Sequence, residues 1–276
     1  MSVPSGSDAP VFIVGIMHRC GTNFLCDLLR LHSAFHLPLR VVEDNALKHA
    51  PLLVDYVDRT YASWGSGKLP LEESCKDTLL QDFGTGMVQF LKRGLPEGAR
   101  LLTKTPGTAN LSTFFRLFPE AKLILLARDG RDVVESASKS WGRRPHAFWM
   151  MKWARNARAI RQFVDGPGRG HENTRWKLVK YEDLVTDTPR VLRDILAFVH
   201  VDVNHFNWAA VEELPLRGSS VHRGQKNQVH WGVVEKPRDF QPIGRWTGWG
   251  AMRRWLFKQI AGRELIALGY ARDSQW

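Results

Sequence analysis

Two stretches of this sequence have the residue types and the spacing of an anion-binding site. The first, Gly15-Ile16-Met17-His18-Arg19-Cys20-Gly21-Thr22-Asn23, follows the short apolar run from Val11 to Val14. Its glycines permit a sharp turn from a buried strand into a helix, which Thr22 or Asn23 would cap. Free backbone N–H groups at such a helix start bind anions, and Arg19 adds a fixed positive charge. The stretch therefore predicts a phosphate site.

An ordinary strand-to-helix turn without a ligand is the alternative interpretation of this stretch, since glycine-containing turns of that kind are common. The stretch is not a Walker A loop. That motif, Gly-x4-Gly-Lys-Ser/Thr, places a lysine before the hydroxyl residue, and Arg19-Cys20-Gly21-Thr22 has none.

The second stretch follows the apolar run over 122–127 and reads Arg128-Asp129-Gly130-Arg131-Asp132, with Ser136 in the helix after it. Arg128 presents a fork of N–H donors and Ser136 presents a hydroxyl, so both could contact one phosphate. A surface turn with internal ion pairs is the alternative. Because parallel strands end at one edge of a sheet, two anion sites at two strand ends predict a ligand with two separated phosphates.

A lysine and two carboxylates are the further candidates for chemistry. Lys104 lies near the end of a predicted strand over 101–106, so it either meets an anion at the sheet edge or is a surface lysine. Glu43 and Asp44 end a short extended piece. One of them could take a proton from a substrate hydroxyl if this piece runs beside the phosphate loop. Capping of a helix that begins near Leu47 is their commoner use.

These residues must be positioned by an α/β domain with a parallel sheet. A chain of 276 residues with 43% hydrophobic and 24% charged content can bury a full core, which predicts a single domain over 11–276 after a flexible polar tail over 1–10. The apolar patterns predict strands over 11–14, 101–106, 122–127 and 176–181. They predict helices from 22 and over 52–61, 78–92, 146–164, 189–199 and 252–268.

Two regions interrupt this pattern. Residues 50–100 carry helical patches around the Gly/Ser-rich 63–67 and look like an insertion that forms an acceptor pocket or a lid. Residues 205–250 have little regular pattern and many Gly, Trp and basic residues, which predicts a functional loop that closes over a ligand. In the last helix, the expected core contacts are Met252, Leu256 and Ile260.

The charge of the chain indicates the kind of partner, and its cysteines indicate the compartment. The formal net charge of +11 favours an anionic ligand, an acidic acceptor or nucleic acid. The basic face of the helix over 146–164 is a solvated surface, or lies on a membrane or nucleic acid. No stretch approaches the roughly 18 to 20 apolar residues of a membrane span, and the polar start is not a secretory signal. Cys20, Cys26 and Cys75 cannot all pair and lack metal-site spacing, so we expect a cytoplasmic protein with free thiols.

Together, these motifs resemble the sulfotransferases that use 3′-phosphoadenosine-5′-phosphosulfate (PAPS), and the bacterial and tyrosylprotein-type members more than the cytosolic small-phenol branch. In that family the first loop reads Gly-x-x-x-Arg-Ser-Gly-Thr-Thr and the second site reads Arg-Asp-x-Arg-(x)4-Ser, which match the two stretches above. Lys-x-Pro, Phe-Pro-x-Ala-Lys and Tyr-Glu-Asp-Leu match at 104–106, 118–122 and 181–184. Cys20 replaces the usual serine and Asn23 a common threonine, and neither change removes the backbone donors.

The resemblance implies a P-loop-type three-layer fold with a central parallel β-sheet flanked by helices. It implies that the 5′-phosphosulfate is held by Arg19, Cys20, Gly21, Thr22 and Asn23, and the 3′-phosphate by Arg128 and Ser136. The residues that would complete the nucleotide site are Tyr181, Arg217, Ser219, Ser220 and Lys236. Lys104 would stabilise charge on the transferring sulfonate or on the bridging oxygen.

The resemblance also implies the reaction, a direct in-line transfer of sulfonate from PAPS to a hydroxyl, or an amine, of an acceptor. Tyrosylprotein-type members imply Glu43 as the base and the cytosolic branch implies His49, so the expected catalytic residues are Glu43, Lys104 and Arg19. No metal is predicted, because sulfonate carries a single charge and the sequence shows no clustered acidic ligands. The expected partners are PAPS and an acceptor that the sequence does not identify, a small molecule, a glycan or a peptide. We expect no nucleic acid and no membrane span, and a homodimer is compatible with the sequence.

Two other functions fit parts of the sequence. A P-loop-like nucleotide or sugar kinase shares the strand-loop-helix phosphate site, but the missing Walker lysine and Mg²⁺ carboxylate disfavour it. A non-catalytic basic protein that binds anions or nucleic acid would use the helix over 146–164 and would not need Lys104 or Ser136.

Overall fold

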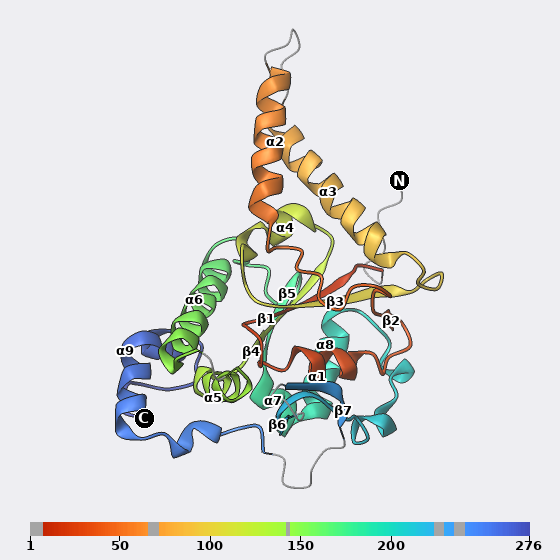
Figure 1. The fold of residues 1–276 in the computed structure, drawn as a ribbon. Helices are drawn as coiled ribbons and strands as arrows, with labels where there is room; N and C mark the ends of the chain where they lie inside the picture. The colour runs from red at the N-terminus through yellow and green to blue at the C-terminus, as the bar shows by residue number, and fades with distance from the viewer. Residues whose placement is uncertain (1–7, 66–71, 142–143, 224–228, 235–240) are drawn as a thin grey trace.

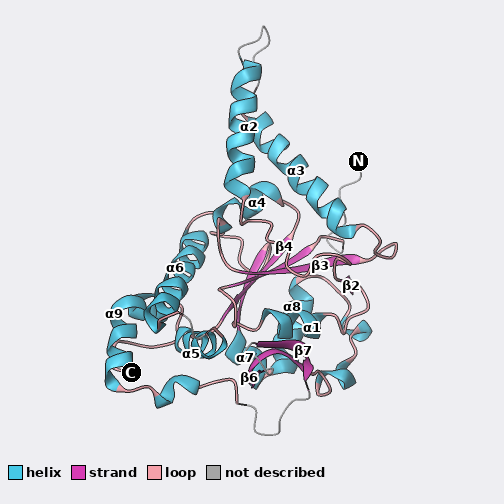
Figure 2. Ribbon diagram, in the orientation of Figure 1, coloured by secondary structure: helices cyan, strands magenta, loops and turns pink. Residues whose placement is uncertain are grey.

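The computed structural model describes residues 8–65, 72–141, 144–223, 229–234 and 241–276, with residues 216–223 and 229–234 described by their backbone alone. In this part of the chain, five parallel strands form a central sheet, drawn in magenta in Figure 2. Their order is β2-β3-β1-β4-β5. The strands are β1 Val11–Gly15, β2 Phe35–His36, β3 Arg100–Pro106, β4 Lys122–Ala127 and β5 Trp176–Lys180. All residues of β1 are buried, as the continuous apolar run predicts for a strand covered on both faces.

The register of the sheet brings three predicted site segments to one edge. Gly15 at the end of β1 pairs with Pro106 of β3 on one side and with Leu126 of β4 on the other. The loops after β1 and β4 and the last residues of β3 therefore meet at the carboxyl edge of the sheet, where open α/β sheets bind ligands.

Helices cover both faces of the sheet, which makes the three layers that the resemblance implies (Figure 1). Helix α1, Thr22–Leu29, packs against β1 and β3, and α8, Thr188–Phe198, packs against β5 on the lower side in Figure 1. On the other side lie α4, Phe114–Leu117, and α6, His146–Asp165. Aromatic contacts connect these layers, because Phe12 of β1 meets Phe114, and Phe163 of α6 meets Trp176 of β5.

Two helices within the region over 50–100 project from the body (Figure 1). They are α2, Ala50–Gly65, and α3, Ser74–Lys92, which contact each other, and α3 also contacts α4. Both are longer than the sequence patches predicted, and α2 begins at Ala50 rather than near Leu47.

The remaining helices and two further strands lie in the second half of the chain. The helices are α5 Gly130–Ser140, α7 Tyr181–Thr186 and α9 Ala251–Ala267, with short 3-10 turns at Leu111–Thr113, Val203–His205, Trp208–Val211 and Arg245–Gly248. An antiparallel pair, β6 Leu216–Arg223 and β7 Val229–Val234, occupies part of the region that the sequence predicted to be without regular structure. Register shifts interrupt the pairing of β6 with β7, so these strands lack the regular alternation of apolar and polar residues by which a strand is predicted.

The buried face of α9 differs in part from the predicted one. Leu256 and Ile260 pack partly buried against the core, as predicted, but Met252 is 75% exposed. The fully buried residues are Phe257, Ala261 and Leu265. Phe257 contacts Trp153 of α6, so packing against that helix determines which side of α9 faces inward. Within the described ranges, no helix is long and apolar enough to cross a membrane.

Candidate active site

The loop between β1 and α1 has an open helix start. Gly21 is the N-cap, with φ 99°, and no side chain hydrogen-bonds to the cap, so the expected capping by Thr22 or Asn23 is wrong. Arg19 also has a positive φ of 75°. The left-handed turn at Gly21 replaces a side-chain cap, and a helix start of this kind presents backbone N–H groups that can bind an anion.

Two close contacts explain the glycines of this loop. A Cβ atom at Gly21 would lie 2.3 Å from the Tyr181 ring, and one at Gly15 would lie 2.5 Å from the Cys20 sulfur. Cys20 is fully buried, and burial raises the pKa of its thiol to about 11. The cysteine is therefore a packed thiol inside the loop and not a thiolate.

The structure brings Arg19 and Ser136 into direct contact. The Arg19 Nε donates a hydrogen bond to the Ser136 Oγ at 3.1 Å, and Ser136 on α5 is 2% exposed. Burial, followed by repulsion from Arg128 and Arg245, lowers the pKa of the Arg19 guanidinium to about 10. The residues expected at two different phosphates thus belong to one compact, positively charged cluster.

Arg128 is the most enclosed cation of this cluster. It is 5% exposed, donates to the carbonyl oxygens of Arg19 and Pro242, and lies 4.5 Å from the centre of the Tyr181 ring. Its Nε is buried without a hydrogen-bond partner, and no acidic side chain of the described residues forms an ion pair with it. The carboxyl groups of Asp132 and Glu182 attract Arg128 without forming an ion pair with it. A buried guanidinium that is not ion-paired is costly, so this position favours an anionic ligand.

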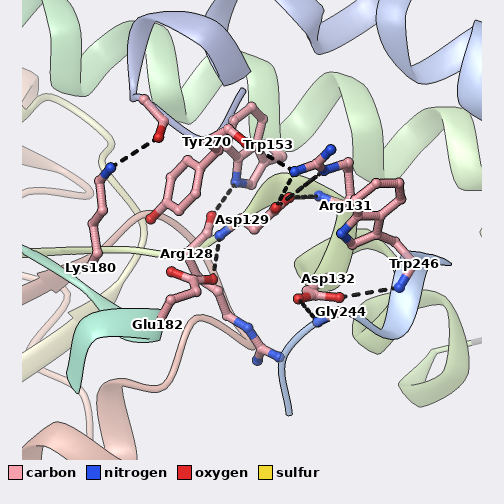
Figure 3. A network of polar contacts seen from close by, with 11 residues as sticks. Arg128, Asp129, Arg131, Asp132, Trp153, Lys180, Glu182, Gly244, Trp246 and Tyr270 are labelled. Atoms are coloured by element: carbon pink, nitrogen blue, oxygen red, sulfur yellow. Dashed lines mark hydrogen bonds and ion pairs between the residues drawn. The ribbon is translucent and has the colours of Figure 1, made fainter. Parts of the chain in front are cut away.

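The other charged residues of the second stretch have structural contacts (Figure 3). Arg131 pairs with Asp129 at 2.6 Å and lies between the Trp246 and Trp276 rings. Asp132 accepts hydrogen bonds from the N–H groups of Gly244, at 2.8 Å, and Trp246, at 3.2 Å. The stretch is therefore a buried ion-pair network next to Arg128 and not a surface turn. No local pattern predicted that Asp132 would hold the chain before α9.

Lys104 and Glu43 meet at the end of β3. Lys104 is 6% exposed, which excludes the surface-lysine alternative, and its Nζ lies 3.9 Å from a Glu43 carboxylate oxygen. Asp44 is less available as a base than Glu43. Its carboxylate already accepts hydrogen bonds from the hydroxyls of Thr103, at 2.8 Å, and Thr105, at 2.7 Å. It also accepts from the Ala46 N–H at 2.8 Å. Neither acid caps a helix, since α2 begins at Ala50; Asp44 instead holds a turn and the end of β3, and Glu43 stays beside the lysine.

Of the remaining predicted residues, some lie near the loop after β1. Tyr181 opens α7, is 6% exposed and contacts Gly21, while His49 is exposed just before α2. The residues from 217 to 220 lie on β6, whose backbone packs against α1 and α5, so that Arg217, Ser219 and Ser220 are near the loop by their backbone. Lys236 and the tail over 1–7 lie outside the described residues.

His18 was not predicted as a site residue, although it precedes Arg19 in the loop. Burial lowers its pKa to about 4, with further lowering by repulsion from Lys152, Arg19 and Lys104, in decreasing order. Lys152 comes from α6, whose basic face the sequence left as a surface feature. In the described part of the chain, no group of three or more His, Cys, Asp or Glu side chains has the arrangement of a metal site.

Comparison with known proteins shows the family to which this chain belongs. A family model described as "Sulfotransferase family" matches residues 10–205. Among solved structures, the sulfotransferase domain of the Synechococcus PCC 7002 olefin synthase has 19% identity and a TM-score of 0.53, covering 95% of this chain and 97% of that one. The sulfotransferase domain from the curacin biosynthetic pathway has 16% identity and a TM-score of 0.52, covering 95% and 98%. A search of curated protein sequences found no match.

Proposed function

Because the chain belongs to the sulfotransferase family and is a sulfonate-transferring enzyme, we propose that its donor is PAPS, bound at the carboxyl edge of the central sheet. The P-loop-type three-layer fold is shared with the two sulfotransferase domains above. The observation that carries the donor proposal is Arg128, a buried cation whose Nε has no hydrogen-bond partner and that forms no ion pair with the described residues. It contacts the phosphate loop through the Arg19 carbonyl. The family assignment replaces the kinase and the non-catalytic alternatives.

In this proposal, the two phosphate groups of the donor occupy the two ends of the cationic cluster. The first-turn N–H groups of α1 and the Arg19 side chain bind the 5′-phosphosulfate, since they form the open helix start. Arg128, just before α5, and Ser136, within that helix, bind the 3′-phosphate. Ser136 already accepts a hydrogen bond from Arg19, so donor binding must rearrange or share this contact.

We propose that Glu43 and Lys104 carry out the transfer itself. The acceptor oxygen attacks the sulfur, the bond between sulfur and the 5′-phosphate oxygen breaks, and 3′-phosphoadenosine-5′-phosphate (PAP) leaves. Glu43 takes the proton of the acceptor hydroxyl, and Lys104 stabilises negative charge on the departing bridging oxygen. Their separation of 3.9 Å supports this division, because both groups lie at one point of the sheet edge. By analogy with phosphoryl transfer, positioning and cations supply most of the rate increase.

The cellular setting and the acceptor belong to the proposal as well. The described cysteines are free, which supports a reducing, cytoplasmic compartment. The acceptor carries the hydroxyl or amine that receives the sulfonate. The homodimer and the single-domain organisation stay predictions.

Thermal unfolding with PAP, AMP and ATP tests the donor proposal. A ligand present at about 100 times its Kd stabilises the folded state by about 2.7 kcal/mol, which raises the Tm of a chain of this size by about 5 °C. We expect this shift with PAP and a much smaller one with AMP, which lacks the 3′-phosphate. Arg128→Gln should lose the PAP shift measured from its own Tm, whereas Arg169→Gln, an exposed control, should keep it. Equal shifts with PAP and AMP would contradict the assignment of a 3′-phosphate site.

A further inference from the structure

His18 lies inside the phosphate loop among cations from three parts of the fold. Its ring meets the edge of Trp141 at 5.8 Å between ring centres, and the Arg19 guanidinium lies 5.9 Å from the same indole. The neighbouring Met17 forms an isolated bridge with Gly107, which places this side of the loop next to the end of β3. His18 thus stands where the loop, β3 and the end of α5 converge.

The charges that shift the pKa of the His18 ring are all positive, although Glu43 lies 3.9 Å from one of them, Lys104. They come from Lys152 on α6, Arg19 on the loop and Lys104 on β3, and no acidic group contributes to the shift of its pKa. Repulsion from these cations adds to burial, so the imidazole of the free protein is neutral at neutral pH. A neutral histidine surrounded by cations gains proton affinity when an anion neutralises them.

Resting on the proposed function, we propose that His18 is a further binding residue for the phosphosulfate end of the donor, and that its imidazole takes up one proton from solvent when this anion enters the loop. Arg19, Trp141 and the adjacent end of β3 hold the ring where the anion arrives. The resulting imidazolium donates a charge-assisted hydrogen bond to a donor oxygen. Proton uptake distinguishes this role from that of a merely structural histidine.

The size of the effect follows from the free-state pKa of about 4. If the anion restores the ordinary pKa of about 6.5, binding near pH 6 takes up about 0.8 proton at this residue. Ligand affinity is then about fourfold higher near pH 6 than near pH 8 through His18 alone.

Isothermal titration calorimetry with PAP in buffers of different ionisation enthalpy measures this uptake. PAP has its own phosphate groups that titrate near pH 6, so the informative quantity is the difference between protein variants under matched conditions. We expect wild type to take up about 0.8 proton more than His18→Asn at about pH 6. His171→Asn, an exposed control, should behave as wild type.

Each outcome decides the inference. Equal proton uptake in wild type and His18→Asn overturns the role of His18 while leaving the donor proposal intact. No PAP binding to wild type refutes the donor proposal and this inference with it. If His18→Asn does not fold, the NMR titration of the wild-type ring replaces it, and an imidazole pKa that PAP does not raise overturns the inference.

Discussion

Asp132 is expected to maintain the donor site without touching the donor. Its carboxylate is 1% exposed and accepts two backbone N–H groups, those of Gly244 and Trp246. Just before them, Pro242 accepts a hydrogen bond from Arg128. Replacing Asp132 by Ala therefore leaves two N–H groups without their acceptor and releases the segment that holds the Arg128 guanidinium.

The magnitude follows from these two bonds. A hydrogen bond to a charged group contributes about 1.5 to 3 kcal/mol, so their loss could cost about 3 to 6 kcal/mol. The lower end applies, because burial raises the pKa of the Asp132 carboxyl and so offsets part of the gain, and because the segment from 241 to 246 is partly exposed to water. We expect Asp132→Ala to lower the free energy of unfolding by about 3 kcal/mol and the Tm by about 5 °C. Asp132→Asn keeps one acceptor oxygen and should lose about half of this.

Chemical and thermal denaturation measure the stability, and PAP titration measures the function. PAP affinity should fall about tenfold in Asp132→Ala, which corresponds to about 1.4 kcal/mol. Asp165→Asn, an exposed carboxylate at the end of α6, is the matched control and should change neither quantity. Unchanged stability would refute the hydrogen-bond argument. Reduced stability with unchanged PAP affinity would show that the segment does not position Arg128.

Three further predictions concern the site and its pH dependence. Glu43→Gln should reduce turnover by about 10² to 10⁴ while PAP affinity stays within about twofold, and equal turnover would remove Glu43 as the base. Ser136→Ala should weaken PAP by about tenfold but leave AMP unchanged, whereas Ser138→Ala on the same helix should affect neither; equal weakening of AMP would refute the 3′-phosphate role. Burial raises the pKa of Glu182, so its stabilising contribution is present below the ordinary value of 4.5 and is lost as pH rises through the folded-state pKa. Denaturation across that range should therefore show a steeper loss for wild type than for Glu182→Gln, and identical slopes would contradict this sign.

Parts of the fold were predictable because they depend on neighbours in the chain. The apolar runs at 11–14 and 122–127 predicted buried parallel strands, and the structure confirms β1 and β4 there. A continuous apolar run has few alternatives to a strand covered on both faces, and a glycine-containing loop after it has few alternatives to a turn into a helix. The order of the motifs was enough to indicate the family.

Other features depended on residues that are distant in the sequence. Glu43 and Asp44 are equivalent by type and spacing, and the hydroxyls of Thr103 and Thr105 engage Asp44 and leave Glu43 beside the lysine. In α9, Phe257 is buried because it packs against α6, whereas Met252 is exposed. The sequence of this helix has several large apolar side chains, so its pattern alone does not show which of them is buried.

The sequence by itself determined β1, β3, β4 and β5, the glycine-containing turn after β1 and the sulfotransferase family, because those follow from local patterns. Only the tertiary structure decided which charges face each other. Lys104, Lys152 and Arg19 gather around His18, and Asp132 reaches the backbone before α9. Coulomb and hydrogen-bond energies act over a few ångströms, so their partners are decided where the sheet edge and the helices bring separate segments together.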